Sequence, residues 1–221
     1  MKKYFKDLGN NSSLKEGAYK IIKLQIITGN LKPGRWLRAE ELSKSLNISN
    51  PPIREALNML EREGFVTIIP RKGVKIADVT FQKVGELFEI RELLESFALK
   101  KSIGKIPLKK LEKIEYEFKE FIDKIENDKN RIQYLDLDKK FHDFLTENCG
   151  NKELIKLLIN LSERIYWFRS LSLSKTSFNN ATKKHLAIID SIKKNDKKLI
   201  KESMKQHFKG AKKSLLREVK S

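Results

Sequence analysis

The sequence of 221 residues is poor in the residues that stabilise secreted or membrane-bound proteins. It contains a single cysteine, Cys149, so it can form neither an intramolecular disulfide nor a zinc cluster of thiolates. No apolar run approaches the roughly 18–20 residues that a membrane helix needs. No apolar segment follows Lys2 and Lys3 to make a signal peptide. These absences predict a cytoplasmic protein that does not enter a membrane.

Proline and glycine are also scarce, and both are concentrated near the N-terminus. Four of the five prolines lie before residue 71, and seven of the ten glycines lie before residue 86. Because both residues mark turns, the first third predicts short elements, and the remainder predicts long helices. We therefore expect a mainly α-helical protein with two domains, residues 1–77 and residues 78–221.

Acidic residues are fewer than basic ones. The sequence has 29 Asp and Glu and 47 Lys and Arg, which gives a formal net charge of +18. Such an excess favours nucleic acid as a partner, yet only 10 of the basic residues are arginines. An AT-rich genome also produces a lysine bias through codon choice, with the lysines spread over solvated helix faces. The charge alone leaves both explanations open, so the positions of the basic residues have to decide.

The first 77 residues contain the start and stop signals of three helices and a hairpin. Ser13 and Glu16 fit a capping box, in which each side chain binds the backbone N–H of the other residue. Pro51 and Pro52 suit a first helical turn, whose N–H groups have no helical partner. The expected elements are helices over residues 13–27, 39–46 and 50–63, strands over 65–69 and 74–77, and a turn over 70–73. This order is that of a winged helix-turn-helix domain with a short β-hairpin.

Short motifs along this domain resemble those of the N-terminal domain of GntR-family transcription regulators. They are Leu31-Lys32-Pro33-Gly34, Glu41-Leu42, Ile48-Ser49, Pro52-Ile53-Arg54-Glu55-Ala56-Leu57, Leu60-Glu61-Arg62-Glu63-Gly64-Phe65 and Pro70-Arg71-Lys72-Gly73-Val74. The resemblance covers roughly residues 14–77. It implies a domain that binds double-stranded DNA.

In a winged helix-turn-helix domain the third helix enters the major groove with its N-terminal residues first. Arg54 lies one turn into this helix and can bind guanine with two hydrogen bonds or bind a phosphate; the resemblance favours a contact of one kind or the other. Asn50 departs from the family, which usually has arginine after the serine, so it either pairs with adenine or only caps the helix. Gly73 allows a tight turn at the wing tip, which can contact the minor groove or the DNA backbone. The DNA-contact candidates are Arg35, Arg38, Ser49, Asn50, Arg54, Arg71, Lys72 and Gly73.

From Thr80 onward the apolar pattern predicts six helices and an all-α bundle. The three histidines of the chain, His142, His185 and His207, lie in this part, on different helices and on apolar stripes. Asp138 lies four residues before His142, so the two side chains share one helix face. A histidine on an apolar stripe is usually a core residue with satisfied hydrogen bonds. The spacing alone therefore leaves open both a packed core and a metal site.

The pattern Asp138-Lys139-Lys140-Phe141-His142, followed by His185 and His207, resembles the ligand-binding domain of the FadR subfamily of GntR regulators. The resemblance covers about residues 80–215. It implies that Asp138 and the three histidines hold a divalent metal such as Zn, Ni or Mn. A metal with four protein ligands keeps one or two positions open, and a small carboxylate effector can occupy them.

Arg91-Glu92-Leu93-Leu94-Glu95 is similar to the motif that opens the first helix of the same ligand-binding domain. Arg91 either binds the far end of the effector or forms a buried salt bridge with Glu95. Further residues that can wall the effector pocket lie on a later helix. They are Arg164, Tyr166, Trp167 and Arg169.

These features predict a transcription regulator, most often a repressor in this family, that works as a homodimer on a palindromic operator. An effector that binds one arrangement of the domains better shifts the DNA-binding population. Two other functions stay open. A histidine-rich metal site can activate water in an enzyme, although the sequence has no phosphate loop, nucleophile motif or GxGxxG fingerprint. Alternatively, the protein binds DNA constitutively and its metal is purely structural.

Overall fold

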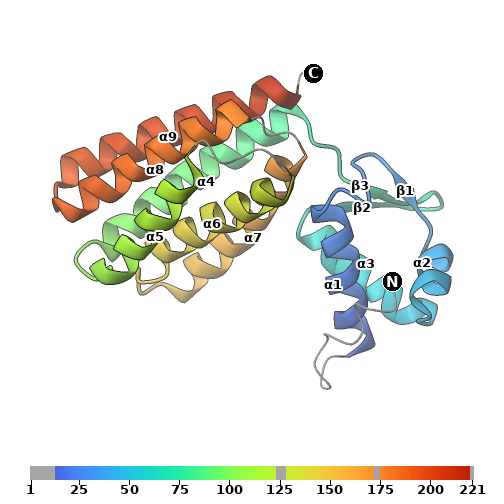
Figure 1. The fold of residues 1–221 in the computed structure, drawn as a ribbon. Helices are drawn as coiled ribbons and strands as arrows, with labels where there is room; N and C mark the ends of the chain where they lie inside the picture. The colour runs from blue at the N-terminus through green and yellow to red at the C-terminus, as the bar shows by residue number, and fades with distance from the viewer. Residues whose placement is uncertain (1–12, 123–127, 172–174, 220–221) are drawn as a thin grey trace. The chain divides into compact units, whose positions relative to one another are not determined.

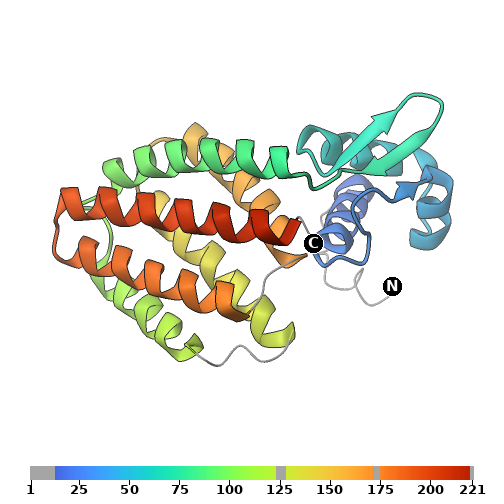
Figure 2. The same cartoon turned by 90° about the horizontal axis from the view of Figure 1, so that it is seen from above.

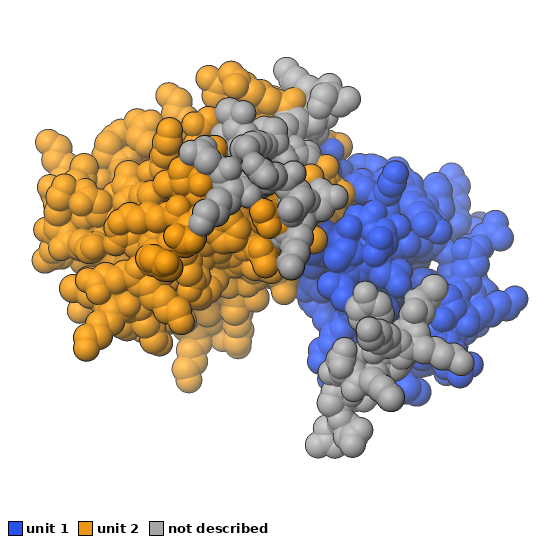
Figure 3. All heavy atoms as spheres, viewed as in Figure 1, with its two compact units in different colours: residues 1–79 blue, residues 80–221 orange. Residues whose placement is uncertain are grey.

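The computed structural model describes residues 13–122, 128–171 and 175–219. The chain divides into two compact units, residues 1–79 and residues 80–221 (Figure 3). The first unit combines helices with a small sheet, and the described part of the second unit is helical, so the predicted fold class is confirmed. Among the described residues, no helix is both long enough and apolar enough to cross a membrane.

The first unit forms its helices where the sequence predicts them. Its elements are α1 (Leu14–Ile27), β1 (Trp36–Leu37), α2 (Ala39–Leu46), α3 (Asn50–Arg62), β2 (Val66–Ile69) and β3 (Gly73–Ile76). The predicted capping box begins α1, because the Ser13 side chain accepts a hydrogen bond from the Glu16 N–H and the Glu16 carboxylate accepts one from the Ser13 N–H. Helix α3 packs against α1, α2 and β2 (Figure 1). Ile22, Ile53 and Leu60 are at most 1% exposed in this core.

The sheet contains one strand that the sequence did not reveal. It is antiparallel with the strand order β1-β3-β2, and β2 pairs with β3 from Val66 opposite Ile76 to Ile69 opposite Gly73. Strand β1 has only two residues, too few for an alternating pattern to be recognised in the sequence. It pairs Trp36 with Lys75, so the segment before α2 is attached directly to strand β3.

The second unit is built from six helices within the described residues. They are α4 (Phe81–Ser102), α5 (Leu108–Phe121), α6 (Asp128–Thr146), α7 (Lys152–Ser170), α8 (Lys175–Lys193) and α9 (Lys197–Val219). Thr80 caps α4, because its side chain accepts a hydrogen bond from the Lys83 N–H. Helix α4 contacts α6, α7 and α9, and α8 contacts α5 and α9 (Figures 1 and 2). The predicted bundle is therefore present.

One part of the core of the second unit consists of aromatic side chains, and another part contains ionisable side chains. Phe118 makes edge-on ring contacts with Tyr134 and Phe141 at centroid distances of 6.1 and 5.4 Å. In the described part of the same unit, seven Arg, Asp, Glu and His side chains are buried, none of them more than 5% exposed: Arg91, Glu95, Asp138, His142, Arg169, His185 and His207. Buried ionisable groups are costly unless they are paired or bind a metal. This cluster therefore marks a candidate site.

Candidate functional site

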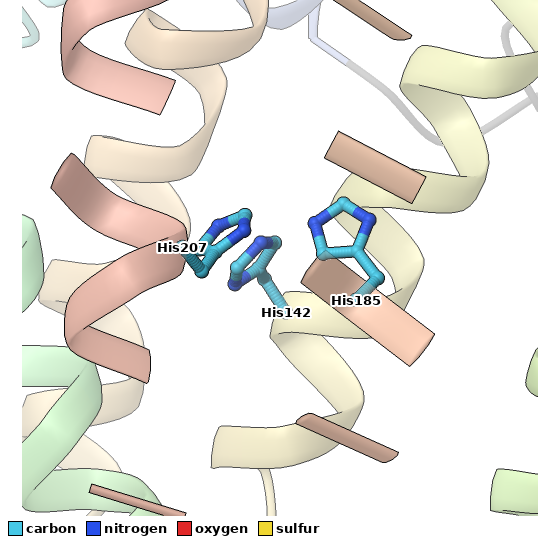
Figure 4. Close-up of side chains that lie close together, drawn as sticks. All are labelled: His142, His185 and His207. Atoms are coloured by element: carbon cyan, nitrogen blue, oxygen red, sulfur yellow. The ribbon is translucent and has the colours of Figure 1, made fainter. Parts of the chain in front are cut away.

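Three imidazole rings meet inside the second unit. His142 extends from α6, His185 from α8 and His207 from α9, and Figure 4 shows the three rings lying close together. One ring nitrogen from each histidine lies within 4.8 Å of the corresponding nitrogens of the other two, and each side chain is at most 1% exposed. The packing of α6, α8 and α9 thus brings together the three histidines that we predicted as metal ligands.

Several nitrogens of these rings lack a hydrogen-bond partner. Within the described part of the chain, Nε2 of His142, Nε2 of His185 and both ring nitrogens of His207 are buried and have no hydrogen-bond partner. Burial lowers the pKa of His185 and His207 well below the ordinary value, so both rings are neutral at pH 7. Neutral imidazole nitrogens that converge from three helices are suitable ligands for a divalent transition metal. The donor set therefore fits the predicted ion.

Glu95 connects Arg91 to His142. Its Oε1 accepts a hydrogen bond from Nε of Arg91 at 2.5 Å, and its Oε2 lies 2.6 Å from Nδ1 of His142. Burial acts to raise the pKa of Glu95, but the charge of Arg91 and the interactions with His142 outweigh burial and lower it to about 2. A carboxylate facing Nδ1 favours a proton on that nitrogen, which leaves the lone pair of Nε2 for a metal. Glu95 therefore orients His142.

Asp138 makes the equivalent connection between Arg169 and His185. Its Oδ2 accepts a hydrogen bond from Nη1 of Arg169, and its Oδ1 lies 3.3 Å from Nε2 of His185. Burial acts to raise the pKa of Asp138, but Arg169, with smaller contributions from His142 and Arg91, lowers it to about 2. Nδ1 of His185 faces the hydroxyl of Tyr134 at 3.4 Å, so its Nε2 is the nitrogen turned toward Asp138. The fourth predicted metal ligand thus lies beside one of the three histidines.

A small cavity lies beside Asp138. Its lining consists of Arg91, Leu135, Asp138, Lys139, Ser162, Ile165, Tyr166 and Arg169. The free volume is about 10 Å³, which is room for roughly one water molecule. Of the four α7 residues predicted to wall a pocket, Tyr166 and Arg169 are in the lining, whereas Arg164 and Trp167 are not.

Arg91 combines the two alternatives predicted for it. Its Nε is used by the buried ion pair with Glu95. Its Nη1 is buried and has no hydrogen-bond partner in the described part of the chain, while the side chain lines the cavity. The side chain is 2% exposed, so water does not satisfy this nitrogen from outside. Arg91 can therefore hold Glu95 and still donate to a ligand.

A groove in the first unit brings together five of the eight predicted DNA contacts. It has a volume of about 640 Å³, and its lining includes Arg38, Arg54, Arg71, Lys72 and Gly73. The groove runs between α3 and the wing, the turn between β2 and β3. The remaining candidates are outside its lining: Arg35 is exposed before β1, Ser49 is the N-cap residue of α3, and Asn50 begins that helix.

Backbone geometry and capping contacts can be compared with the residue types at the wing and at the start of α3. At the wing, Arg71 has a φ of 63° and Gly73 a φ of 115°. A Cβ at Gly73 would lie 3.3 Å from the carbonyl oxygen of Leu37, so this position suits glycine. At α3, the Ser49 side chain makes no capping hydrogen bond, and the buried Oδ1 of Asn50 has no partner in the described part of the chain. Asn50 therefore does not cap the helix through its oxygen.

Glu40 also belongs to this surface, although no pattern in the sequence indicated it. It lies in the first turn of α2 and also lines the groove, with Oε1 3.8 Å from Nη2 of Arg54. Both side chains are exposed. A carboxylate beside the arginine of the third helix had no signal in the sequence, because the two residues are on different helices.

Comparison with known families gives these two units an identity. Residues 14–76 match the gntR family of bacterial regulatory proteins, and residues 86–210 match the FCD domain. The chain belongs to the GntR family and carries an FCD domain. It is a DNA-binding transcriptional regulator. The GntR match covers the winged helix-turn-helix, and the FCD match contains the whole histidine cluster.

Relatives of this GntR regulator align with it over most of their length. YdhC, an HTH-type transcriptional regulator of Bacillus subtilis, is 29% identical over 86% of this chain and 85% of its own length. The gluconate operon transcriptional repressor of Bacillus licheniformis is 24% identical over 85% of this chain and 79% of its own length. As predicted, these relatives are regulators and not enzymes.

Solved structures share the fold. McbR/YncC of E. coli superposes with a TM-score of 0.72, covering 90% of this chain and 94% of that chain at 19% identity. The metal-free FCD domain of TM0439 superposes with a TM-score of 0.58, covering 65% of this chain and 99% of that chain at 22% identity. At these identities the likeness establishes the fold alone.

Two residues of the FCD site were missed as partners of the predicted metal ligands. Glu95 was considered only as a partner of Arg91, and Arg169 only as a residue of a pocket wall. Each contacts a residue far along the chain: Glu95 contacts His142 across 47 positions, and Arg169 contacts Asp138 across 31. The available signal was a polar pair, Arg91 and Glu95, four residues apart on the apolar face of a helix.

Proposed function

We propose that this GntR regulator is a homodimeric repressor whose affinity for a palindromic operator changes when a small carboxylate effector binds at a metal ion in the FCD domain. The observation that carries the proposal is the convergence of buried, unpartnered imidazole nitrogens from three helices. In this scheme residues 1–77 bind DNA, and residues 78–221 bind the metal and effector and form the dimer. The regulator acts in the cytoplasm, where its operator is.

The metal ligands in this proposal are the three histidines and Asp138. His142 and His185 would bind through Nε2, His207 through one ring nitrogen, and Asp138 through Oδ1, because these buried atoms have no hydrogen-bond partner among the described residues. Three imidazoles and one carboxylate suit Zn, Ni or Mn. When bound, the ion supplies a positive charge that holds the effector's carboxylate.

Arg91 is the proposed second contact for the effector. Its unpartnered Nη1 supports this role, because a buried guanidinium N–H gains a strong charge-assisted bond from a carboxylate. The present cavity has room for roughly one water molecule. Effector binding therefore has to move lining side chains of α4, α6 or α7. A ligand that binds one arrangement of these helices better shifts the population toward it, which is the requirement for regulation.

The DNA contacts in this proposal come from α3 and the wing. Arg54 contacts a guanine or a phosphate in the major groove, and Arg71, Lys72 and Gly73 contact the minor groove or the backbone. Four more positions complete the proposed interface: Arg35, Arg38, Ser49 and Asn50. The groove of about 640 Å³ between α3 and the wing supports this assignment, because it places three arginines and a lysine on one surface.

The proposed homodimer uses an apolar surface of α4. Ile90, Leu93 and Phe97 are 50%, 70% and 51% exposed and repeat at the spacing of one helix face. Helix α4 already buries its opposite face in the core, where Val84 and Leu99 are at most 1% exposed. A second copy that covers the outer face would also supply the second winged helix that a palindromic operator requires.

A DNA-binding titration tests the proposed function. Fluorescence anisotropy with DNA from the region upstream of its own gene would be measured at several salt concentrations, with and without metal, and with a panel of small carboxylic acids. We expect sequence-specific binding that one of the acids weakens only when metal is present. Absence of specific binding at every salt concentration would reject a regulator of this region. Specific binding that no acid alters, in a protein that retains metal, would support the alternative of a purely structural metal.

His185→Ala tests the metal site directly. We expect the metal content, measured by elemental analysis, to fall well below one ion per chain. Tyr116→Ala is the control, because Tyr116 is 65% exposed in the same unit, and its metal content should match that of the unaltered protein. Unchanged metal content in His185→Ala would refute the assigned ligands.

A further inference from the structure

Helix α9 carries an excess of lysines on its exposed side. The helix contacts α4 and α8 at the outside of the bundle (Figures 1 and 2). Residues 197–217 contain eight basic residues and one acidic residue, Glu202. Six of the lysines are exposed: Lys197, Lys198, Lys201, Lys205, Lys209 and Lys213. Steps of three or four residues return to the same side of a helix, so four of them share one face about 17 Å long. We call this set the lysine row: Lys198, Lys201, Lys205 and Lys209.

A lysine bias of the whole sequence does not explain the composition of this helix. Helix α5 of the same unit has four lysines and four glutamates. On α9, Lys212 pairs with Glu89, but within the described part of the chain none of the six exposed lysines forms an ion pair. The carboxylate of Glu202 accepts a hydrogen bond from the Gln206 amide instead. The row is therefore a band of positive charge without acidic partners.

This arrangement is unfavourable for the helix itself. Five of the lysines follow one another at intervals of four residues: Lys197, Lys201, Lys205, Lys209 and Lys213. Each therefore lies beside a like charge, which weakens a helix. Lys197 and Lys198 also occupy the first turn, which has no acidic residue and where the helix dipole disfavours positive charge. A bound polyanion would neutralise the row and remove this cost.

The partner that suits the row is a surface of phosphates. Lysine is a point charge that binds a phosphate without reading a base. Anionic lipids also offer phosphates, but helices that bind membranes insert an apolar face into the lipid. The apolar face of α9 is already used by the core, because its main residues are at most 4% exposed: Ile200, Met204, Phe208 and Leu215. Lipid is therefore the weaker candidate.

DNA is the phosphate surface that this regulator binds in any case. The first unit belongs to a family of DNA-binding domains, and the two units are parts of one chain. DNA held by one unit of a chain is at a high effective concentration for the other unit. A weak, purely electrostatic contact can therefore add measurably to the affinity.

We propose that the lysine row of α9 is a second DNA-contact surface, which binds phosphates of double-stranded DNA whatever the base sequence. It adds to the contacts of the winged helix-turn-helix. Contacts of this kind raise affinity and the rate of association, but they do not select a sequence. The inference goes beyond the proposed function and requires neither the metal ion nor an effector.

A triple variant of the full-length protein tests this surface: Lys198→Gln, Lys205→Gln and Lys209→Gln. Lys201 stays, because it also lines the groove beside Leu93 and Phe97, which the proposed dimer covers. Fluorescence anisotropy would measure binding to the upstream region and to a shuffled duplex of equal length at several salt concentrations. We expect the slope of log affinity against log salt concentration to decrease by about 2 or more, because each lost phosphate contact removes about 0.9. At low salt both duplexes should bind about 10- to 100-fold more weakly, by the same factor.

A second triple variant on α5 is the matched control: Lys109→Gln, Lys110→Gln and Lys113→Gln. These lysines are exposed in the same unit, and their loss changes the net charge by the same amount. We expect little change in the salt slope. Equal losses in both variants would attribute the effect to overall charge and overturn the proposed surface. The proposal is also wrong if the α9 variant leaves the slope unchanged, or if it weakens binding to the upstream region more than to the shuffled duplex.

Co-sedimentation with phosphatidylglycerol vesicles tests the alternative partner. We expect the unaltered protein and the α9 variant to sediment with the vesicles to the same extent. Vesicle binding that the α9 substitutions abolish, together with unchanged DNA binding, would replace DNA by a lipid surface and overturn the proposal. Circular dichroism of each variant would verify folding, which substitution of exposed lysines should leave intact.

Discussion

Glu95→Gln is the substitution that tests the charge network around the histidines most directly. Glutamine keeps the size of Glu95 but has one acceptor oxygen in place of two charged ones. The carboxylate contacts Nε of Arg91 at 2.5 Å and Nδ1 of His142 at 2.6 Å. The single oxygen of glutamine can no longer accept hydrogen bonds from both nitrogens in this geometry. Arg91 is then left buried without its counter-ion.

Two estimates of the stability lost in Glu95→Gln agree. The fall in the pKa of Glu95 from 4.5 to about 2 corresponds to about 3 kcal/mol of stability at neutral pH. Removing one partner of a buried ion pair costs about 3–5 kcal/mol by comparison with other proteins. A loss of about 3 kcal/mol would lower the melting temperature of a chain of this size by roughly 6–12 °C. Metal affinity should also fall by about 10- to 100-fold, because His142 loses the group that orients it.

The stability lost in Glu95→Gln depends on pH in a definite direction. The pKa of Glu95 is lower in the folded state than in the unfolded state, so its contribution is complete above the unfolded pKa of 4.5. It is lost as the pH falls through about 2, where the folded protein takes up the proton. The stability difference between the unaltered protein and Glu95→Gln should therefore be constant above about pH 5 and shrink below it.

Denaturant unfolding followed by circular dichroism measures this difference, and calorimetry measures metal affinity. Glu89→Gln on the same helix is the control, because Glu89 is 72% exposed and pairs with Lys212 at the surface. We expect the control to change stability by about 0–1 kcal/mol. If Glu95→Gln behaves like Glu89→Gln at neutral pH, or if its effect is the same at pH 3 as at pH 7, the assignment of Glu95 is refuted.

Four further predictions concern the other surfaces. Arg54→Ala should weaken operator binding by about 1–3 kcal/mol, and anisotropy with altered operators would show relaxed preference at one base pair if the contact is to a base and none if it is to a phosphate. Glu40→Gln should strengthen DNA binding, because it removes a negative charge 3.8 Å from Arg54; weaker binding would contradict this. Gly73→Ala should destabilise the first unit by roughly 1–3 kcal/mol, measured by thermal unfolding, because its φ is 115° and the new Cβ would lie 3.3 Å from the Leu37 oxygen. Leu93→Glu should convert the proposed dimer to a monomer in sedimentation velocity, and a dimer of unchanged stability would contradict an interface on α4.

Much of the fold could be predicted because its signals are local. The capping box at Ser13, the cap at Thr80 and the turn residues at the wing each act within a few positions of the chain. The helices of the first unit therefore begin and end close to the predicted residues. Strand β1 was not found, because its two residues depend on pairing with β3, which is more than thirty positions away.

The candidate site was predicted in part for the same reason. Asp138 and His142 were connected by a spacing of four residues, and the other histidines were found because few exist. The roles of Glu95, Arg169 and Glu40 depend on contacts between different helices, and no spacing along the chain encodes such contacts. The sequence also left Arg91 with two alternatives, and the structure shows one side chain whose Nε serves Glu95 while Nη1 stays free.

The distribution of the histidines over α6, α8 and α9 has a consequence for folding. A ring from any one of these helices reaches the others only after all three have packed, so the unfolded chain has no preformed site and the cluster assembles late. An ion that binds only the assembled cluster then stabilises the folded state of residues 80–221. In hydrogen exchange, such an ion would slow the opening of α8 and α9 and leave α1–α3 unaffected. Metal supply would thus set the lifetime of one unit of the chain independently of the other.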